Sequence, residues 1–162
     1  MAKFNALSIL AASLCLFSLL SFASCVEYLR VQGTVYCDTC RAGFETRLSE
    51  NIAGAKVKIE CKSLITNEIT FTAEGVTNET GGYNIRVGGD HEEEMCEAVA
   101  VSSPRKDCQK LDPERDRGPI VLTRNAGIES NIRYANPLGF MIDNDVAGCA
   151  EALKEVGFRK KK

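Results

Sequence analysis

The chain has 162 residues, of which 20 are Lys or Arg, 22 are Asp or Glu and one is His, so its formal net charge is −2 at pH 7. Apart from RKKK at 159–162 it has no basic stripe, which argues against binding to nucleic acid. Its length suits one domain with a real hydrophobic core and is too great for a miniature disulfide knot.

The N-terminal segment has the pattern of a secretory signal peptide. Lys3 precedes an apolar run at 6–22 that only serines interrupt, and small residues follow at 23–25. A membrane anchor would have charged flanks and no small-residue cleavage site. We therefore expect residues 1–25 to be removed and residues 26–162 to form one domain, secreted to the extracellular space without stable membrane insertion. Cleavage takes Lys3 from the 20 basic side chains and leaves 19 against 22 acidic ones.

The cysteine count points to an oxidising compartment. Of the eight cysteines, Cys15 and Cys25 fall within the predicted signal peptide. An even number remains in a chain that we expect to be secreted, and thiols do not stay reduced there, so this combination favours a framework of disulfides. The mature cysteines are Cys37, Cys40, Cys61, Cys96, Cys108 and Cys149.

Apolar and polar residues alternate along most of the mature chain, which is the pattern of strands that bury one face. Turn-forming stretches rich in Gly, Pro, Asn and Asp lie between these runs. About seven short strands with no helical pattern between them indicate an all-β fold, an antiparallel β-sandwich or barrel. The expected strands are 29–37, 55–62, 69–74, 83–87, 95–101, 119–123 and 128–134.

A short amphipathic helix is expected at the C-terminal end. Apolar residues there follow helical spacing, and Gly157 offers a stop. Asp143 and Asp145 lie where the N-terminus of a helix favours negative charge. The predicted apolar side consists of Val146, Cys149, Ala150, Leu153 and Val156.

The sequence CDTC at 37–40 ends the first alternating run and places two cysteines three residues apart. If the strand continues to Cys40, the two Cα atoms lie about 10 Å apart and the side chains point to opposite faces. That separation exceeds the roughly 7 Å that a disulfide tolerates. We therefore exclude a Cys37–Cys40 bond and expect each cysteine to bind a partner elsewhere, with the other pairings open at this point.

Two chemical alternatives for CDTC have weaker support. A redox pair would lie at the start of a helix within a βαβ unit, where the helix dipole lowers the pKa of the thiol, and neither signal is present. A zinc site would need a second close pair of Cys or His, whereas the other cysteines are singly placed and His91 is remote in the sequence. We favour structural disulfides, with no metal site and no cofactor.

Three segments carry a resemblance to a known family. They are QGTVYCDTCR at 32–41, SPRKDC at 103–108 and NPLGF at 136–140. The first resembles the signature of the olive-pollen major-allergen family (pollen Ole e I type), and the other two are similar to further segments of that family. The similarity runs from about residue 31 to residue 158, most of the mature chain.

The resemblance implies a secreted plant protein of pollen or anther, with a disulfide-stapled β-barrel or sandwich and no catalytic residues. In this family the first cysteine pairs with the fifth, the second with the sixth and the third with the fourth. Transferred to this sequence, that pattern implies the pairs Cys37–Cys108, Cys40–Cys149 and Cys61–Cys96.

The resemblance further implies a function in binding. We expect a non-enzymatic extracellular protein and potential pollen allergen that is a ligand of a cell-surface receptor or of a wall component in pollen-tube development. The alternative is a secreted hydrolase, or an inhibitor of one, that acts through exposed loops. Against catalysis, the one histidine has no recognisable Ser or Cys nucleophile beside it, and every mature cysteine is expected to be oxidised.

Two polar stretches are candidates for modification or binding. Residues 78–80 form an N-x-T sequon in a turn-rich stretch, so we expect a glycan on Asn78. DHEEE at 90–94 is the densest acidic run, and we interpret it as a solvated loop rather than a calcium site, which needs converging oxygen ligands at defined spacing. The basic end at 159–162 is interpreted as a solvated tail.

Overall fold

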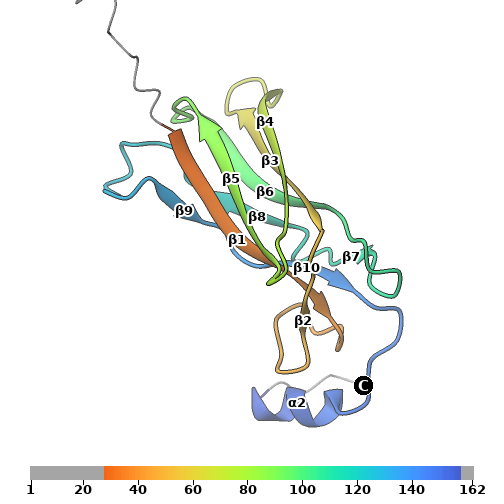
Figure 1. The fold of residues 1–162 in the computed structure, drawn as a ribbon. Helices are drawn as coiled ribbons and strands as arrows, with labels where there is room; N and C mark the ends of the chain where they lie inside the picture. Colours follow the sequence, from red (N-terminus) through yellow and green to blue (C-terminus); the bar gives the residue numbers. More distant parts are fainter. Residues whose placement is uncertain (1–27, 158–162) are drawn as a thin grey trace, which may run out of the picture.

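The computed structural model describes residues 28–157, which form two β-sheets and one short helix (Figure 1). The predicted signal peptide at 1–25 and the basic end at 159–162 lie outside the described residues. The elements are β1 (Tyr28–Asp38), β2 (Glu50–Asn51), β3 (Lys56–Ser63), β4 (Ile69–Val76), β5 (Gly82–Gly88), β6 (Glu94–Ser102), β7 (Lys110–Leu111), β8 (Arg117–Ile120), β9 (Ile132–Tyr134), β10 (Leu138–Met141) and α2 (Cys149–Glu155).

The long strand β1 holds the larger sheet together because it changes partners along its length. Its first half pairs with β5 antiparallel and with β9 parallel. Its second half pairs with β10 parallel and with β2 antiparallel, and β7 extends the sheet from β10. The smaller sheet has the strand order β4-β3-β6-β8, and its neighbours are all antiparallel.

The core lies between the two sheets and is filled by the alternating apolar side chains. Leu29, Val31 and Val35 point into it from β1, and Val57 and Ile59 point into it from β3. Each fully buried side chain of this kind contributes about 1.5–3 kcal/mol relative to an exposed one. The predicted disulfide-stapled β-sandwich with one short C-terminal helix is confirmed.

The larger sheet differs from the prediction in the direction of two strands and in the number of strands. β9 and β10 run parallel to β1, so the sandwich is not purely antiparallel. The strands β2, β7 and β10 were not expected, because two to four residues are too few to show a period of two. Strand direction depends on how the chain returns to the sheet, which alternation does not encode.

The last two predicted strands are shorter than expected because a buried arginine forms hydrogen bonds with the loop before β9. Arg133 is only 4% exposed and donates hydrogen bonds to the carbonyl oxygens of Thr123, at 2.9 Å, and of Ser130. These bonds replace a strand ladder at 121–123 and 128–131, so β8 ends at Ile120 and β9 begins at Ile132.

The predicted helix exists, but its extent and apolar side were partly wrong. α2 begins after Gly148, so Asp143 and Asp145 precede it, and Glu151 is the acid in its first turn. Gly157, with φ at 72°, follows its end as expected. The buried side is Cys149, Ala152 and Leu153, whereas Val146, Ala150 and Val156 are exposed. Within residues 28–157, no helix is long and apolar enough to cross a membrane.

Candidate functional site

Within residues 28–157 the structure holds three disulfides, and they are the pairs that the resemblance implies. Cys37 joins the end of β1 to the loop before β7, and the Cys61–Cys96 bond lies between two directly paired residues of β3 and β6. Cys40 fastens α2 to the turn after β1. The Cα–Cα distances are 6.1 Å for Cys37–Cys108, 5.4 Å for Cys40–Cys149 and 4.0 Å for Cys61–Cys96.

The CDTC segment separates its cysteines by a turn and not by a continuing strand, so the assumed extension to Cys40 was wrong. β1 ends at Asp38, whose buried carboxylate accepts hydrogen bonds from the backbone N–H groups of Cys40, at 3.1 Å, and Gly43, at 2.8 Å. An Asp side chain that binds the backbone a few residues on mimics a turn and competes with the strand ladder. Cys37 and Cys40 nevertheless bind different partners.

A second buried carboxyl group lies near Asp38 and was not foreseen. Asp112 is 2% exposed; its Oδ1 accepts a hydrogen bond from the N–H of Glu114 at 3.0 Å, and its Oδ2 has no partner within residues 28–157. Burial raises the pKa of Asp112, and the negative charge of Asp38 adds to the rise. Both oxygens of Asp38 bind backbone amides, and both carboxyl groups are buried, so this pair holds two turns and is closed to solvent.

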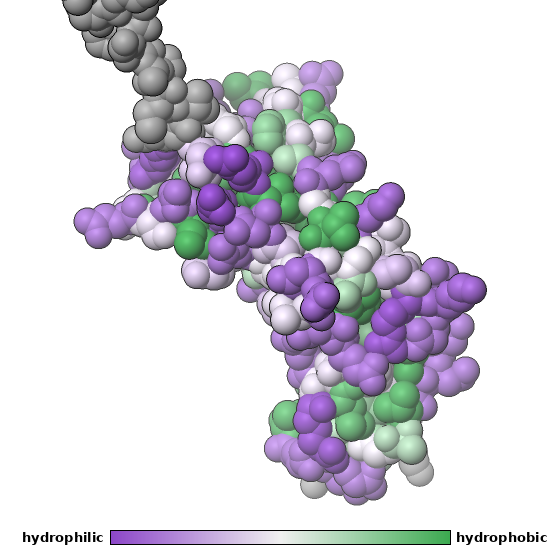
Figure 2. Space-filling view, in the orientation of Figure 1, coloured by the Kyte–Doolittle hydropathy of each residue, from purple (hydrophilic) through white to green (hydrophobic). Residues whose placement is uncertain are grey.

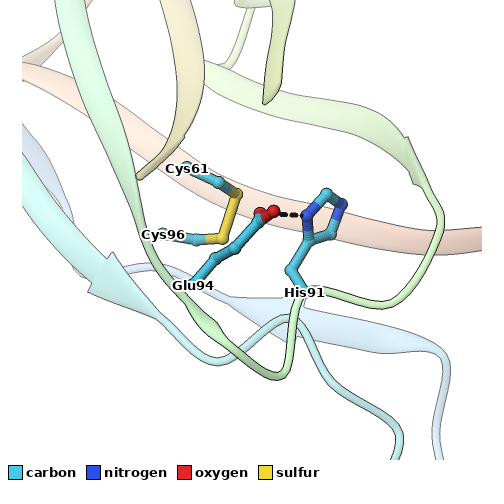
Figure 3. A group of neighbouring side chains, drawn as sticks. All are labelled: Cys61, His91, Glu94 and Cys96. Atoms are coloured by element: carbon cyan, nitrogen blue, oxygen red, sulfur yellow. Dashed lines mark hydrogen bonds and ion pairs between the residues drawn. A yellow bond between two sulfur atoms is a disulfide. The ribbon is translucent and has the colours of Figure 1, made fainter. Parts of the chain in front are cut away.

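The acidic run at 90–94 is only partly the solvated loop that we expected. His91 is 8% exposed and lies against the ring of Phe71, with the ring centroids 4.7 Å apart. Its Nδ1 is 2.6 Å from Oε2 of Glu94 (Figure 3). Its Nε2 is 3.1 Å from the carbonyl oxygen of Gly88. The side chains of Asp90, Glu92 and Glu93 are exposed, as predicted.

His91 is remote from the cysteines in sequence but close to two of them in space. The ligand atoms of Cys61, His91, Glu94 and Cys96 all lie within 4.8 Å of one another (Figure 3). The form of cysteine that binds metal ions is the thiolate, and these two sulfur atoms are bonded to each other. While the disulfide is intact, the group therefore offers a metal ion the imidazole of His91 and the carboxylate of Glu94, and these two side chains already bind each other.

A pocket of about 420 Å³ opens beside this group, and we call it the β6–β8 pocket. Three of the apolar side chains that line it are solvent-exposed: Leu64 is 66% exposed, Met95 50% and Val121 55%. Ile65, in the same turn as Leu64, is 89% exposed. The other lining residues are His91, Glu92, Glu94, Cys96, Pro119, Ile120, Leu122 and Thr123.

The predicted glycosylation residue lies in an exposed turn that it organises itself. Oδ1 of Asn78 accepts hydrogen bonds from the N–H of Thr80, at 3.0 Å, its hydroxyl, at 2.8 Å, and the N–H of Gly82, at 3.0 Å. These bonds use the amide oxygen and not the nitrogen Nδ2, the atom that a glycan would occupy. The glycan on Asn78 stays a prediction.

Two packed sheets and the three disulfides of residues 28–157 define a cysteine-stapled β-sandwich protein. A family model described as "Pollen protein Ole e 1 like" matches residues 27–157, and the chain belongs to this family of pollen proteins, which includes pollen allergens.

Similar proteins bear out the family and the fold. The chain is 47% identical to the anther-specific protein LAT52 of Solanum lycopersicum over 92% of this chain and 93% of that protein. It is 42% identical to pollen allergen Che a 1 of Chenopodium album over 96% of this chain and 95% of that protein. The crystal structure of the major plantain pollen allergen Pla l 1 superposes with a TM-score of 0.67 at 33% identity, covering 76% of this chain and all of that one.

Proposed function

We propose that the protein is secreted and works without catalysis, as an extracellular binding protein in pollen-tube development whose partner is a cell-surface receptor. Membership of a pollen-protein family supports the setting, and three disulfides suit an oxidising compartment. The similar proteins are named as anther-specific proteins and pollen allergens, which agrees with a function other than catalysis and with a potential role as an allergen.

The observation that carries this proposal is the apolar surface around the β6–β8 pocket. Leu64, Met95 and Val121 expose half or more of their area around a hollow, and Ile65, next to Leu64 in the same turn, is exposed outside the hollow. Contiguous exposed apolar surface with a polar rim marks protein-binding sites, and apolar anchors that enter such hollows supply most of the affinity. The surface extends beyond the hollow, which favours a protein partner over a small molecule.

Affinity capture tests the proposal when the bait is compared with two matched variants. Val121→Asp places a charge at the mouth of the pocket, and Val156→Asp places the same charge after α2, where the valine is similarly exposed at 57% against 55%. We expect the wild-type protein and Val156→Asp to retain the same membrane receptor from pollen or pistil extract, and Val121→Asp to lose it. Equal capture by all three would place the binding site elsewhere.

The hydrolase alternative is tested on the same purified, oxidised protein. We expect no turnover of wall polysaccharides or of protein substrates, and no inhibition of secreted hydrolases. Turnover that copurifies with the protein and disappears in a variant of an exposed loop carboxylate would replace the binding proposal with an enzyme.

A further inference from the structure

The outer face of the larger sheet carries polar and aromatic side chains on three of its strands, β1, β5 and β9. β1, β5 and β9 lie side by side with β1 in the middle, and their inward residues are buried in the core (Figure 1). Six of the outward residues form what we call the arginine–tyrosine face: Tyr28, Arg30, Gln32, Asn84, Arg86 and Tyr134. The partly buried Ile132 of β9 also points outward, beside Arg30.

Two arginines stand directly opposite each other on this face. Arg30 of β1 is the cross-strand partner of Arg86 of β5. Both guanidinium groups lie over the ring of Tyr28, with Arg86 at 3.8 Å and Arg30 at 5.4 Å from the ring centroid. Hydrogen bonds from Arg30 and Arg86 lower the pKa of Tyr28. The aromatic ring thus holds two positive charges side by side.

Neither arginine forms an ion pair with a carboxylate within residues 28–157. Their repulsion is therefore not neutralised there, and like charges directly opposite each other destabilise a sheet. In Figure 2, which has the orientation of Figure 1, hydrophilic side chains gather over β1 and β5 close to the start of β1. The chain as a whole carries a net charge of −2, so this local excess of positive charge is not a consequence of composition. By contrast, ion pairs with acids are formed by arginines such as Arg47, Arg105 and Arg117 within residues 28–157.

The neighbours of the arginine pair are suited to a sugar. Tyr134 is 75% exposed and presents a flat aromatic surface one strand away, where it is the cross-strand partner of Gln32. Gln32 in turn pairs with Asn84, so two amides adjoin the two guanidinium groups. Three strands and four residues along β1 give a face of about 10 by 13 Å, room for a few sugar rings.

We infer that the arginine–tyrosine face binds a linear polymer of uronic acids. Guanidinium groups bind carboxylates through two parallel N–H···O bonds, and Arg30 and Arg86 supply two such groups without competing acids among residues 28–157. Tyr134 offers its ring to the apolar face of a sugar, and Gln32 and Asn84 bind hydroxyl groups. This site lies on a different sheet from the β6–β8 pocket and goes beyond the receptor partner proposed above.

Titration calorimetry with polygalacturonate tests the inference. We expect the secreted protein to bind the de-esterified polymer, to bind its fully methyl-esterified form at least about tenfold more weakly, and to lose affinity as salt is added. The double variant Arg30→Gln/Arg86→Gln should lose about tenfold or more, and Tyr134→Ala about threefold or more. Melting temperatures should stay close to wild type, since Arg86 and Tyr134 are exposed and Arg30 is only partly buried.

The matched control removes the same charge elsewhere. Lys56→Gln/Lys154→Gln changes two exposed lysines, on β3 and α2, and should retain wild-type affinity. The inference is wrong if this control loses as much affinity as the arginine variant, if the methyl ester binds equally well, or if polyglutamate binds the arginine pair as tightly. Val121→Asp should bind the polymer normally, so failure of this inference and failure of the receptor proposal are distinguishable.

Discussion

Cys40, in the turn after β1, and Cys149, at the start of α2, are joined by a disulfide although 109 residues separate them in the chain. α2 has only seven residues, a length at which a helix is not stable in water by itself. The bond, together with the burial of Ala152 and Leu153, therefore keeps the C-terminal helix on the domain.

Replacing this pair by Cys40→Ser/Cys149→Ser should lower the free energy of unfolding by about 2–5 kcal/mol, because a native disulfide in a small domain contributes that much. Denaturant unfolding measures the loss, and helical circular dichroism should fall with it. Ala150→Ser, at an exposed position of α2, is the control for the helix surface. An unchanged free energy of unfolding in the double variant would contradict a structural role for the CDTC motif.

Asp112→Asn should stabilise the protein at neutral pH. The pKa of Asp112 is raised in the folded protein, chiefly by burial. Its protonated form therefore contributes to the free energy of unfolding at low pH. That contribution is lost as pH rises from the unfolded value of about 3.9 through the raised folded value. Asn keeps the Oδ1 acceptor for Glu114 and cannot ionise, so the variant should unfold at higher denaturant at pH 7 and lose this part of the pH dependence.

The exposed Asp90→Asn serves as the comparison for a simple change of surface charge. Measuring both variants from pH 3 to 8 separates burial from net charge. A variant Asp112→Asn that is less stable than wild type at pH 7 would mean that the carboxylate has a partner that compensates its burial.

The acidic run divides into solvated and structural members. Glu92→Gln/Glu93→Gln should change the free energy of unfolding by less than about 0.5 kcal/mol, as exposed substitutions usually do. Glu94→Gln should cost about 1–3 kcal/mol, because its carboxylate is the hydrogen-bond partner of the buried His91. Equal effects in the two variants would show that the His91–Glu94 contact contributes nothing to stability.

Occupancy of the sequon can be tested with Asn78 itself left in place, at the cost of the one hydrogen bond from the Thr80 hydroxyl to Asn78 in the valine variant. Thr80→Ser keeps the N-x-S/T pattern, whereas Thr80→Val removes it and preserves side-chain volume. Intact-mass measurement of protein secreted from plant cells should find a glycan on wild type and on Thr80→Ser, and none on Thr80→Val. A wild-type mass equal to that of the bare polypeptide would refute the glycan on Asn78.

Much of the strand pattern could be predicted from the sequence because burial of one face imposes alternation on each strand separately. The residues Leu29, Val31 and Val35 pointed inward as expected, and so did Val57 and Ile59. The disulfide pairs came from the resemblance, since the geometry of one segment cannot choose distant partners, and the continuing strand that excluded a Cys37–Cys40 bond is absent because β1 ends at Asp38.

The features that the sequence did not reveal depend on register between distant strands. Arg30 and Arg86 become neighbours only through the pairing of β1 with β5. His91 reaches Cys61 and Cys96 only because β3 and β6 are paired and the loop before β6 folds inward. The turn at Asp38 left a local signal, an Asp two residues before the second cysteine, that the strand interpretation overlooked.

Hydrogen exchange of the protein alone and with its captured receptor tests the central claim, binding at the β6–β8 pocket, most directly. We predict that added protection falls on residues 63–65, 91–96 and 120–123, and that the segment around Val156 is unchanged. Protection confined to other surfaces, with these three segments exchanging as in the free protein, would contradict the claim.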